Sequence, residues 1–124
     1  MVVGLGVDLI ELSRVRAALQ RWGDRLVAKL MDPAEAGRLP QAQEERALAV
    51  ARAIAAKEAA SKAIGTGWSR GVRWRDVVLE DAASPGVRLL GRALLFARAR
   101  GGDRTELRVE QRGDLVLGEV RLLG

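Results

Sequence analysis

The sequence predicts a single α+β domain, and three observations support this prediction. The chain has 124 residues, 48% of them hydrophobic, which suits one globular domain of ordinary size. An apolar, β-branched stretch opens the chain and two long helical patterns follow it. Short strand-like segments and one further helix make up the second half, in an order unlike repeated βα units. We therefore expect one domain over residues 1–124.

The first element is a predicted strand over residues 2–10, VVGLGVDLI. Asp8 is the only polar side chain in it. A carboxylate near the end of a buried strand costs free energy unless something pairs with it. Asp8 therefore either caps the following helix, as Asp often does, or has a partner elsewhere in the fold.

A helical pattern follows over residues 11–30, and Gly23 is expected to interrupt it. Its apolar positions form one stripe: Leu12, Val15, Leu19, Trp22 and Leu26. Arg14, Arg21 and Arg25 lie on the opposite face. Composition alone does not decide whether this basic face is simply solvated or docks an acidic partner.

Residues 31–43 contain two prolines and a glycine, so we expect a loop with at most a short helical turn. A second helix is predicted over residues 44–64, which lack internal glycine and proline. Gly65 and Gly67 supply its stop.

The second half is predicted to contain strands at 75–79 and 87–90, joined by a turn at 83–86. A helix at 89–100 and a terminal hairpin then follow. The hairpin pairs residues 106–110 with 115–122 and turns at Gly113-Asp114.

The composition excludes several kinds of chemistry. The chain has no cysteine and no histidine, which rules out disulfides, thiolate sites, His-ligated zinc and a Ser-His-Asp triad. The lack of cysteine and of a signal-like start favours a cytoplasmic protein, and no apolar run is long enough to span a membrane. A formal net charge of +5 suits an acidic partner. A nucleic-acid-binding module is a weak alternative, because one Phe and no Tyr leave few stacking platforms.

The segment AAKEAASKAIGTG at 55–67 places Glu58 and Lys62 four residues apart on one helical face. Such a spacing is typical of a surface ion pair worth about 0.2–0.5 kcal/mol. Small apolar residues share that helical sector, so a partly buried carboxylate in need of a cation is also possible. A lone G-T-G is too short to identify a phosphate-binding loop.

In combination, several segments are more specific than any one of them. GVDLIELSR at 6–14, AAKEAASKAIGTG at 55–67, the later SPG and GRAL resemble the acyl-carrier-protein synthase family, the small 4′-phosphopantetheinyl transferases. The resemblance follows the family's order from Val3 to about Leu94. It implies a small antiparallel sheet packed with a long central helix. It also implies transfer of the phosphopantetheine arm of coenzyme A to a serine of an apo acyl carrier protein, releasing 3′,5′-ADP.

The resemblance also implies a site. Asp8 and Glu58 would hold Mg²⁺, and Glu58 and Lys62 would be the catalytic residues, with the nucleophile supplied by the partner. The residues expected to contact coenzyme A are Lys57, Ser61, Lys62, Gly65, Thr66, Gly67 and Pro85. Similar proteins are homotrimers with sites between subunits. In this family the helix after G-V-D docks the acidic carrier protein, which would give Arg14, Arg21 and Arg25 a partner.

The sequence departs from the family pattern at two places associated with the nucleotide end of coenzyme A. An arginine and an aromatic residue usually precede A-A-K-E-A, whereas this chain has Ala53 and Ile54. The family's late S-L-S-H-like segment is replaced by residues 108–111, RVEQ. These departures motivate an alternative hypothesis, a non-catalytic relative that binds acyl carrier protein or coenzyme A.

Overall fold

The computed structural model describes residues 1–80 and 86–124. The elements in chain order are β1 (Val2–Glu11), α1 (Leu12–Trp22), α2 (Asp24–Leu30), α3 (Pro33–Gly37), α4 (Gln43–Ala63), the 3₁₀ helix η1 (Trp74–Asp76), β2 (Val77–Leu79), β3 (Val87–Leu89), α5 (Gly91–Ala99), β4 (Arg104–Arg112) and β5 (Leu115–Leu123). The predicted turn at 83–86 lies mostly outside the described residues.

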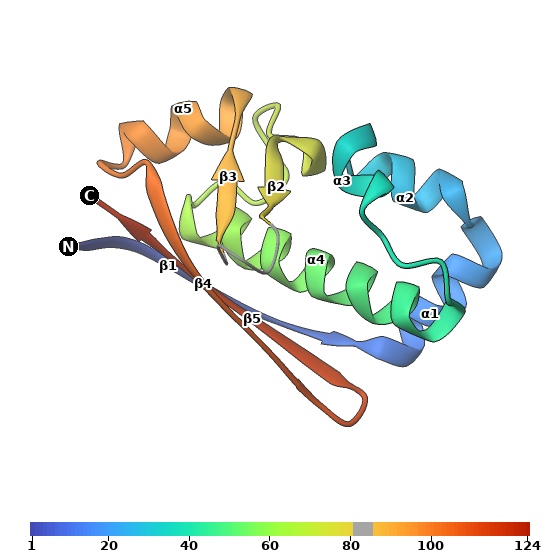
Figure 1. Ribbon diagram of the computed structural model, residues 1–124. Coiled ribbons are helices and arrows are strands. Elements are labelled where there is room, and N and C mark those ends of the chain that lie inside the picture. The colour runs from blue at the N-terminus through green and yellow to red at the C-terminus, as the bar shows by residue number, and fades with distance from the viewer. Residues whose placement is uncertain (81–85) are drawn as a thin grey trace.

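The three long strands form one antiparallel sheet in the order β1-β5-β4, and β2 and β3 form a separate two-stranded ladder. Helix α4 lies along the long sheet, while β2, β3 and α5 lie on the other side of that helix (Figure 1). The α+β prediction and the long central helix are therefore confirmed.

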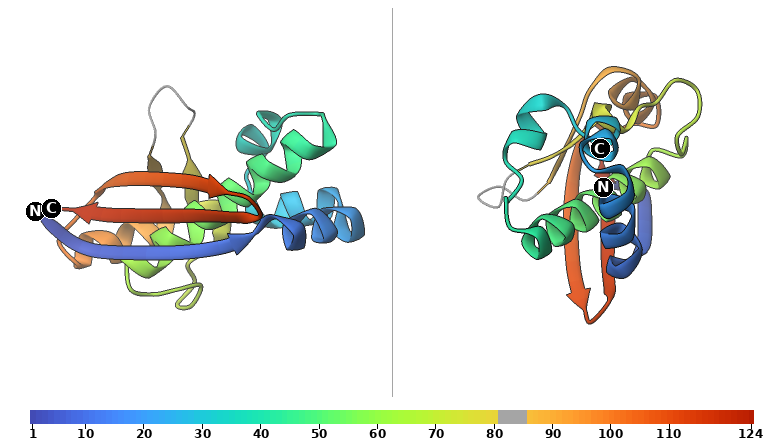
Figure 2. Two further views of the ribbon diagram at one scale, coloured as in Figure 1. Left: turned by 90° about the horizontal axis from the view of Figure 1, so that it is seen from below. Right: turned by 90° about the vertical axis from the view of Figure 1, so that its right-hand side faces the viewer.

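The two chain ends meet at one end of the long sheet, and α1 and α2 lie at the opposite end (Figure 2). The backbone N–H of Gly124 donates to the carbonyl of Met1 at 2.9 Å, which closes β1 against β5 at this edge. Within the described ranges, no helix is both long and apolar enough to cross a membrane.

Glycines allow β1 and β5 to lie directly on the backbone of α4. A Cβ on Gly4 would overlap the carbonyl of Ala63, and a Cβ on Gly6 would overlap the carbonyl of Ala59. Gly118 of β5, which pairs with Asp8, also lies on α4, because a Cβ there would overlap the carbonyl of Ala55. Since Gly4, Gly6 and Asp8 share one face of the strand, the glycines bring the Asp8 carboxylate close to the helix.

Two buried clusters form the core, and α4 contributes to both. One cluster joins the C-terminal half of α4 to β2, β3, α5 and β5; the other joins the N-terminal half to α1 and α2. Alanines on α4 keep the distance to its neighbours short on several sides at once. Helix α4 therefore contributes side chains to both halves of the core.

Three local predictions need correction. Trp22 is 46% exposed instead of buried, because Gly23 (φ +54°) ends α1 there and α2 starts in a new direction. The predicted helix at 89–100 starts at Gly91, because Leu89 pairs with Val77 in the β2–β3 ladder. The predicted strand at 75–79 is shorter, because its first residues form η1.

Candidate active site

Asp8 and Lys62 meet where β1 crosses α4. The Lys62 Nζ donates to Asp8 Oδ1 at 2.7 Å and to the carbonyl of Val7 at 3.1 Å. The Asp8 side chain is 18% exposed and that of Lys62 is 49% exposed, so the pair lies at the surface within reach of a ligand. Asp8 does not cap α1, whose N-cap is Glu11 and has no side-chain cap bond.

Glu58 lies one helical turn before Lys62 on α4, and its side chain is partly buried. The expected Glu58–Lys62 surface pair does not form, because Lys62 turns to Asp8. Among the described residues, the Glu58 carboxylate has no ion-pair or hydrogen-bond partner. This leaves a carboxylate, one helical turn from Lys62, that can take a ligand.

The residues present are compatible with a magnesium ion. In the described part of the chain, no three Asp or Glu side chains gather as a ready-made metal site. Magnesium, however, is usually held by one or two carboxylates, together with waters and phosphate oxygens of the substrate. Asp8 and Glu58 offer that oxygen set, on two elements whose spacing the glycines of β1 fix.

The Gly65-Thr66-Gly67 turn closes the C-terminus of α4. Gly65 and Gly67 have φ of +84° and +56°, a region that side chains disfavour. The Gly67 N–H donates to the carbonyl of Ser61 at 3.1 Å, so the turn folds back on the last turn of the helix. A ligand can approach the backbone closely here, because a Cβ on Gly67 would meet nothing within 4 Å.

Two predicted cofactor contacts, Lys57 and Ser61, are buried in this structure. Lys57 is 0% exposed and its Nζ lies 2.9 Å from Glu35 Oε1, on a different side of α4 from Lys62. Burial lowers the pKa of Lys57 below its usual range, and the Glu35 carboxylate offsets this only in part. Ser61 is also buried, and its hydroxyl donates to the carbonyl of Glu58 at 2.7 Å. Neither side chain can reach a phosphate in this conformation.

The predicted basic face is exposed as expected. The guanidinium of Arg21 lies 4.9 Å, and that of Arg25 lies 5.9 Å, from the centroid of the Trp22 ring, so the exposed indole joins the basic surface. Arg14 forms a loose ion pair with Glu11 at 3.7 Å. Arg14, Arg21 and Arg25 belong to α1 and α2, and these helices lie at the end of the molecule away from the chain termini (Figure 2).

A cavity lies where the family arginine is replaced by Ala53. Its volume is about 410 Å³, and its apolar lining comes from α4, from β2 and from the segments on either side of α3: Met31, Leu39, Ala49, Ala53 and Leu79. The guanidinium of Arg38 stands in its wall and donates to the carbonyl of Leu79 at 3.1 Å. Pro85, which is predicted to contact coenzyme A, lies outside the described residues.

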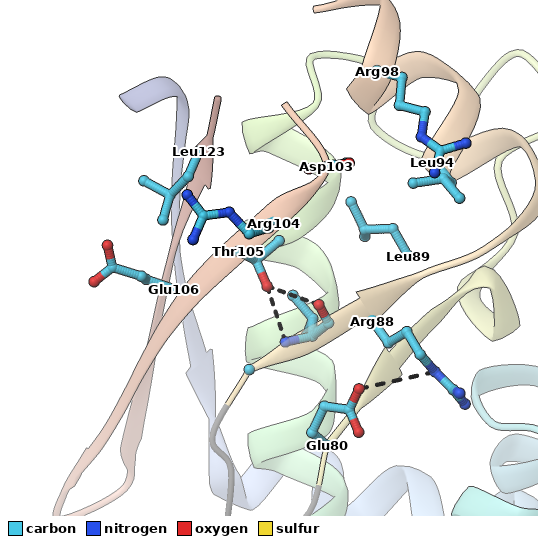
Figure 3. A pocket seen from close by; sticks show the side chains of 12 residues that line it. Glu80, Arg88, Leu89, Leu94, Arg98, Asp103, Arg104, Thr105, Glu106 and Leu123 are labelled. Carbon is cyan, nitrogen blue, oxygen red and sulfur yellow. Dashed lines mark hydrogen bonds and ion pairs between the residues drawn. The ribbon is translucent and has the colours of Figure 1, made fainter. Parts of the chain in front are cut away.

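A second cleft, of about 730 Å³, lies between β3 and β4 beside α5 (Figure 3). Thr105 bridges the two strands there: its hydroxyl donates to the carbonyl of Val87 at 2.7 Å and accepts from the N–H of Val87 at 3.2 Å. Of the described residues predicted for the site, none lines this cleft. The candidate site is therefore at the β1–α4 contact and not here.

Two residues that make long-range contacts were missed by sequence reasoning. Glu35 is the buried partner of Lys57, and nothing in the short segment around it signals burial. Arg100 follows α5 and lies against Gly65, and its Nε donates to the carbonyl of Val3 at 3.2 Å. Both are long-range contacts, which the spacing of residues along the chain does not reveal.

The comparisons with known proteins show the family and the fold of this chain. A holo-[acyl-carrier-protein] synthase of Solidesulfovibrio magneticus is 41% identical over 126 residues, covering 100% of both chains. The crystal structure of the holo-[acyl-carrier-protein] synthase from Neisseria meningitidis superposes with a TM-score of 0.85 at 30% identity, covering 100% of both chains. A Bacillus anthracis synthase in complex with CoA (3′,5′-ADP) superposes with a TM-score of 0.73 at 26% identity, covering 98% of this chain and 96% of that one. The model of the 4′-phosphopantetheinyl transferase superfamily matches residues 4–111, and the chain belongs to this superfamily, in the family of the holo-[acyl-carrier-protein] synthases.

Proposed function

We propose that this protein transfers the 4′-phosphopantetheine arm of coenzyme A to a serine of an apo acyl carrier protein and releases 3′,5′-ADP. The observation that carries the proposal is the Asp8–Lys62 contact where β1 crosses α4, with Glu58 one helical turn before Lys62. Phosphoryl transfer depends mainly on positioning and charge neutralisation, so two carboxylates, a metal ion and a lysine are sufficient. The relatives named above carry the same activity in their names.

Each residue has a role that its position supports. Asp8 and Glu58 would hold Mg²⁺, which when bound neutralises charge on the pyrophosphate. Lys62 would neutralise charge on the phosphate or protonate the leaving group. Its ammonium lies at the surface, 2.7 Å from Asp8. The backbone of the Gly65-Thr66-Gly67 turn would approach coenzyme A. The serine hydroxyl of the carrier would lose its proton to Glu58 or to water, because the chain has no histidine.

We propose that the basic face of α1 and α2 docks the acidic carrier protein. Arg14, Arg21 and Arg25 are exposed there, and complementary charge mainly raises the rate of encounter. Nucleic acid and membrane are not expected partners, and a cytoplasmic location remains a prediction.

A homotrimer is the expected assembly, and one exposed surface supports burial against another copy. Leu5, Val7 and Leu9 point outward from β1 and are 57%, 46% and 56% exposed. A row of apolar side chains on an open sheet face is typical of an interface. Sedimentation equilibrium would give the mass of three chains; a monomer at micromolar concentration would contradict this part of the proposal.

The activity is tested by incubating several apo acyl carrier proteins with coenzyme A, Mg²⁺ and the protein, and then measuring intact masses. The expected result is a mass increase of one phosphopantetheine group, which a chelator abolishes. Absence of this increase with every carrier would contradict the proposal.

The cavity beside Ala53 favours a second candidate, a non-catalytic relative that binds coenzyme A or the carrier protein. Calorimetry separates the two: tight binding of carrier protein without a mass increase would favour this candidate. Binding of coenzyme A accompanied by turnover would exclude it.

A further inference from the structure

Lys57 is a buried cation for which the proposed reaction has no use. Its Nζ donates to Glu35 Oε1 at 2.9 Å, to the carbonyl of Trp74 at 3.2 Å and to the carbonyl of Val77. These contacts use all three N–H groups of the ammonium. The other oxygen of Glu35 accepts the N–H of Leu79 at 3.0 Å. One ion pair therefore ties α4 to α3, η1 and β2.

The side chain of Trp74 extends this network toward the candidate site. Its ring stacks on that of Trp68, with centroids 4.0 Å apart and planes inclined by 19°. Trp68 directly follows Gly67, the last residue of the glycine turn. A continuous chain of contacts thus runs from the Glu35–Lys57 pair, through the backbone and ring of Trp74, to the distal end of that turn.

The Trp68 ring is held in this position at a cost. Its indole N–H is buried and has no acceptor in the part of the chain that the structure describes. A buried donor without a partner loses its hydrogen bond to water, so packing and stacking have to compensate. The position of Trp74, which Lys57 fixes through the backbone carbonyl, is one source of that compensation.

We propose that Lys57, with Glu35, is a positioning residue for the Gly65-Thr66-Gly67 turn and acts through the Trp74–Trp68 stack. This rests on the proposed function, in which the turn receives coenzyme A. Lys57 then influences coenzyme A binding without touching it. A purely stabilising ion pair would instead affect the folded fraction and leave the affinity for coenzyme A unchanged.

The test is a double-mutant cycle in the full-length protein. Lys57→Met/Glu35→Leu replaces both buried charges by apolar groups, a change that folded proteins often tolerate, and so keeps the domain folded. Trp68→Leu removes the stack. We expect each change to raise the KM for coenzyme A about tenfold, with kcat and the KM for carrier protein within about threefold. Because both changes act through one contact chain, combining them should add little to the larger single effect.

The near-ultraviolet circular dichroism of the stacked indoles gives a readout independent of activity. The Lys57→Met/Glu35→Leu variant should lose this signal while its far-ultraviolet spectrum remains that of the folded protein. Leu115→Ala, a substitution at an exposed position of β5, is the control and should change neither the signal nor either KM.

Two results would overturn the proposal: an unchanged KM for coenzyme A together with an intact indole signal in the Lys57→Met/Glu35→Leu variant, or fully additive effects in the cycle. If the wild-type protein transfers no phosphopantetheine, the proposed function fails. The indole signal and calorimetric binding of coenzyme A then still decide whether Lys57 controls the turn.

Discussion

Two lysines five residues apart on α4 have opposite environments. Lys57 is 0% exposed and paired with Glu35, whereas Lys62 is 49% exposed and paired with Asp8. Their local sequences are similar, since each is surrounded by alanines and small residues. What differs is the element packed on each face of the helix: α3, η1 and β2 over Lys57, and one edge strand, β1, beside Lys62. Tertiary packing thus separates a buried anchor from a surface site on one helix.

The largest expected effect is a loss of transfer activity on substitution at the surface site. Glu58→Ala removes the carboxylate that has no partner among the described residues, and transfer should fall about 10³-fold. Because that carboxylate makes no hydrogen bond or ion pair with the described residues, the free energy of unfolding should change by less than about 1 kcal/mol. Intact-mass assays and urea unfolding measure the two quantities. Activity near that of the wild type would remove Glu58 from the metal site.

The next largest effect is a loss of stability on substitution of the buried lysine. Lys57→Met leaves the Glu35 carboxylate buried without its partner, and unfolding should become easier by about 3–5 kcal/mol. Urea unfolding measures this loss. Lys57→Met/Glu35→Leu is the matched control and should recover most of the stability, since it removes both charges. A single variant as stable as the wild type would show that the pair is dispensable.

Lys62→Met is the counterpart substitution at the surface, and it sharpens the contrast. Its ion pair is half exposed, so the loss of stability should stay below about 1 kcal/mol. Transfer should nevertheless fall about 100-fold, because the phosphate loses a neutralising charge. Equal losses of stability in Lys57→Met and Lys62→Met would refute the difference between the two faces.

The smallest effect tests the contact on which the site is built. Gly6→Ala places a methyl group against the carbonyl of Ala59 and should lower stability by about 1–3 kcal/mol while moving Asp8 away from α4. Gly37→Ala is the control, because a Cβ there meets nothing within 4 Å. Thermal unfolding compares the two variants. If the two variants unfold at the same temperature, the close approach of β1 to α4 does not constrain the site.

Sequence reasoning predicted most of the fold, because periodicity and glycine placement reveal local structure. The strand carrying Asp8, the interruption at Gly23 and the helix carrying Glu58 all follow from such signals. The partner of Asp8 could not be predicted, because Lys62 is 54 residues away in the chain. The burial of Lys57 could not be predicted either, since it depends on Glu35 and on carbonyls of η1 and β2. Helical spacing gives the angle between the Lys57 and Lys62 side chains around the axis of α4. It does not reveal which elements pack over each of them.

A crystal structure with coenzyme A and Mn²⁺ in place of Mg²⁺ tests the central claim most directly, because the anomalous signal of manganese locates the ion. We expect the ion between Asp8 and Glu58, the Lys62 ammonium beside a phosphate, and Lys57 still buried against Glu35. An ion bound elsewhere, or a Lys57 ammonium turned toward the phosphates, would contradict the division of α4 into a buried anchor and a surface site.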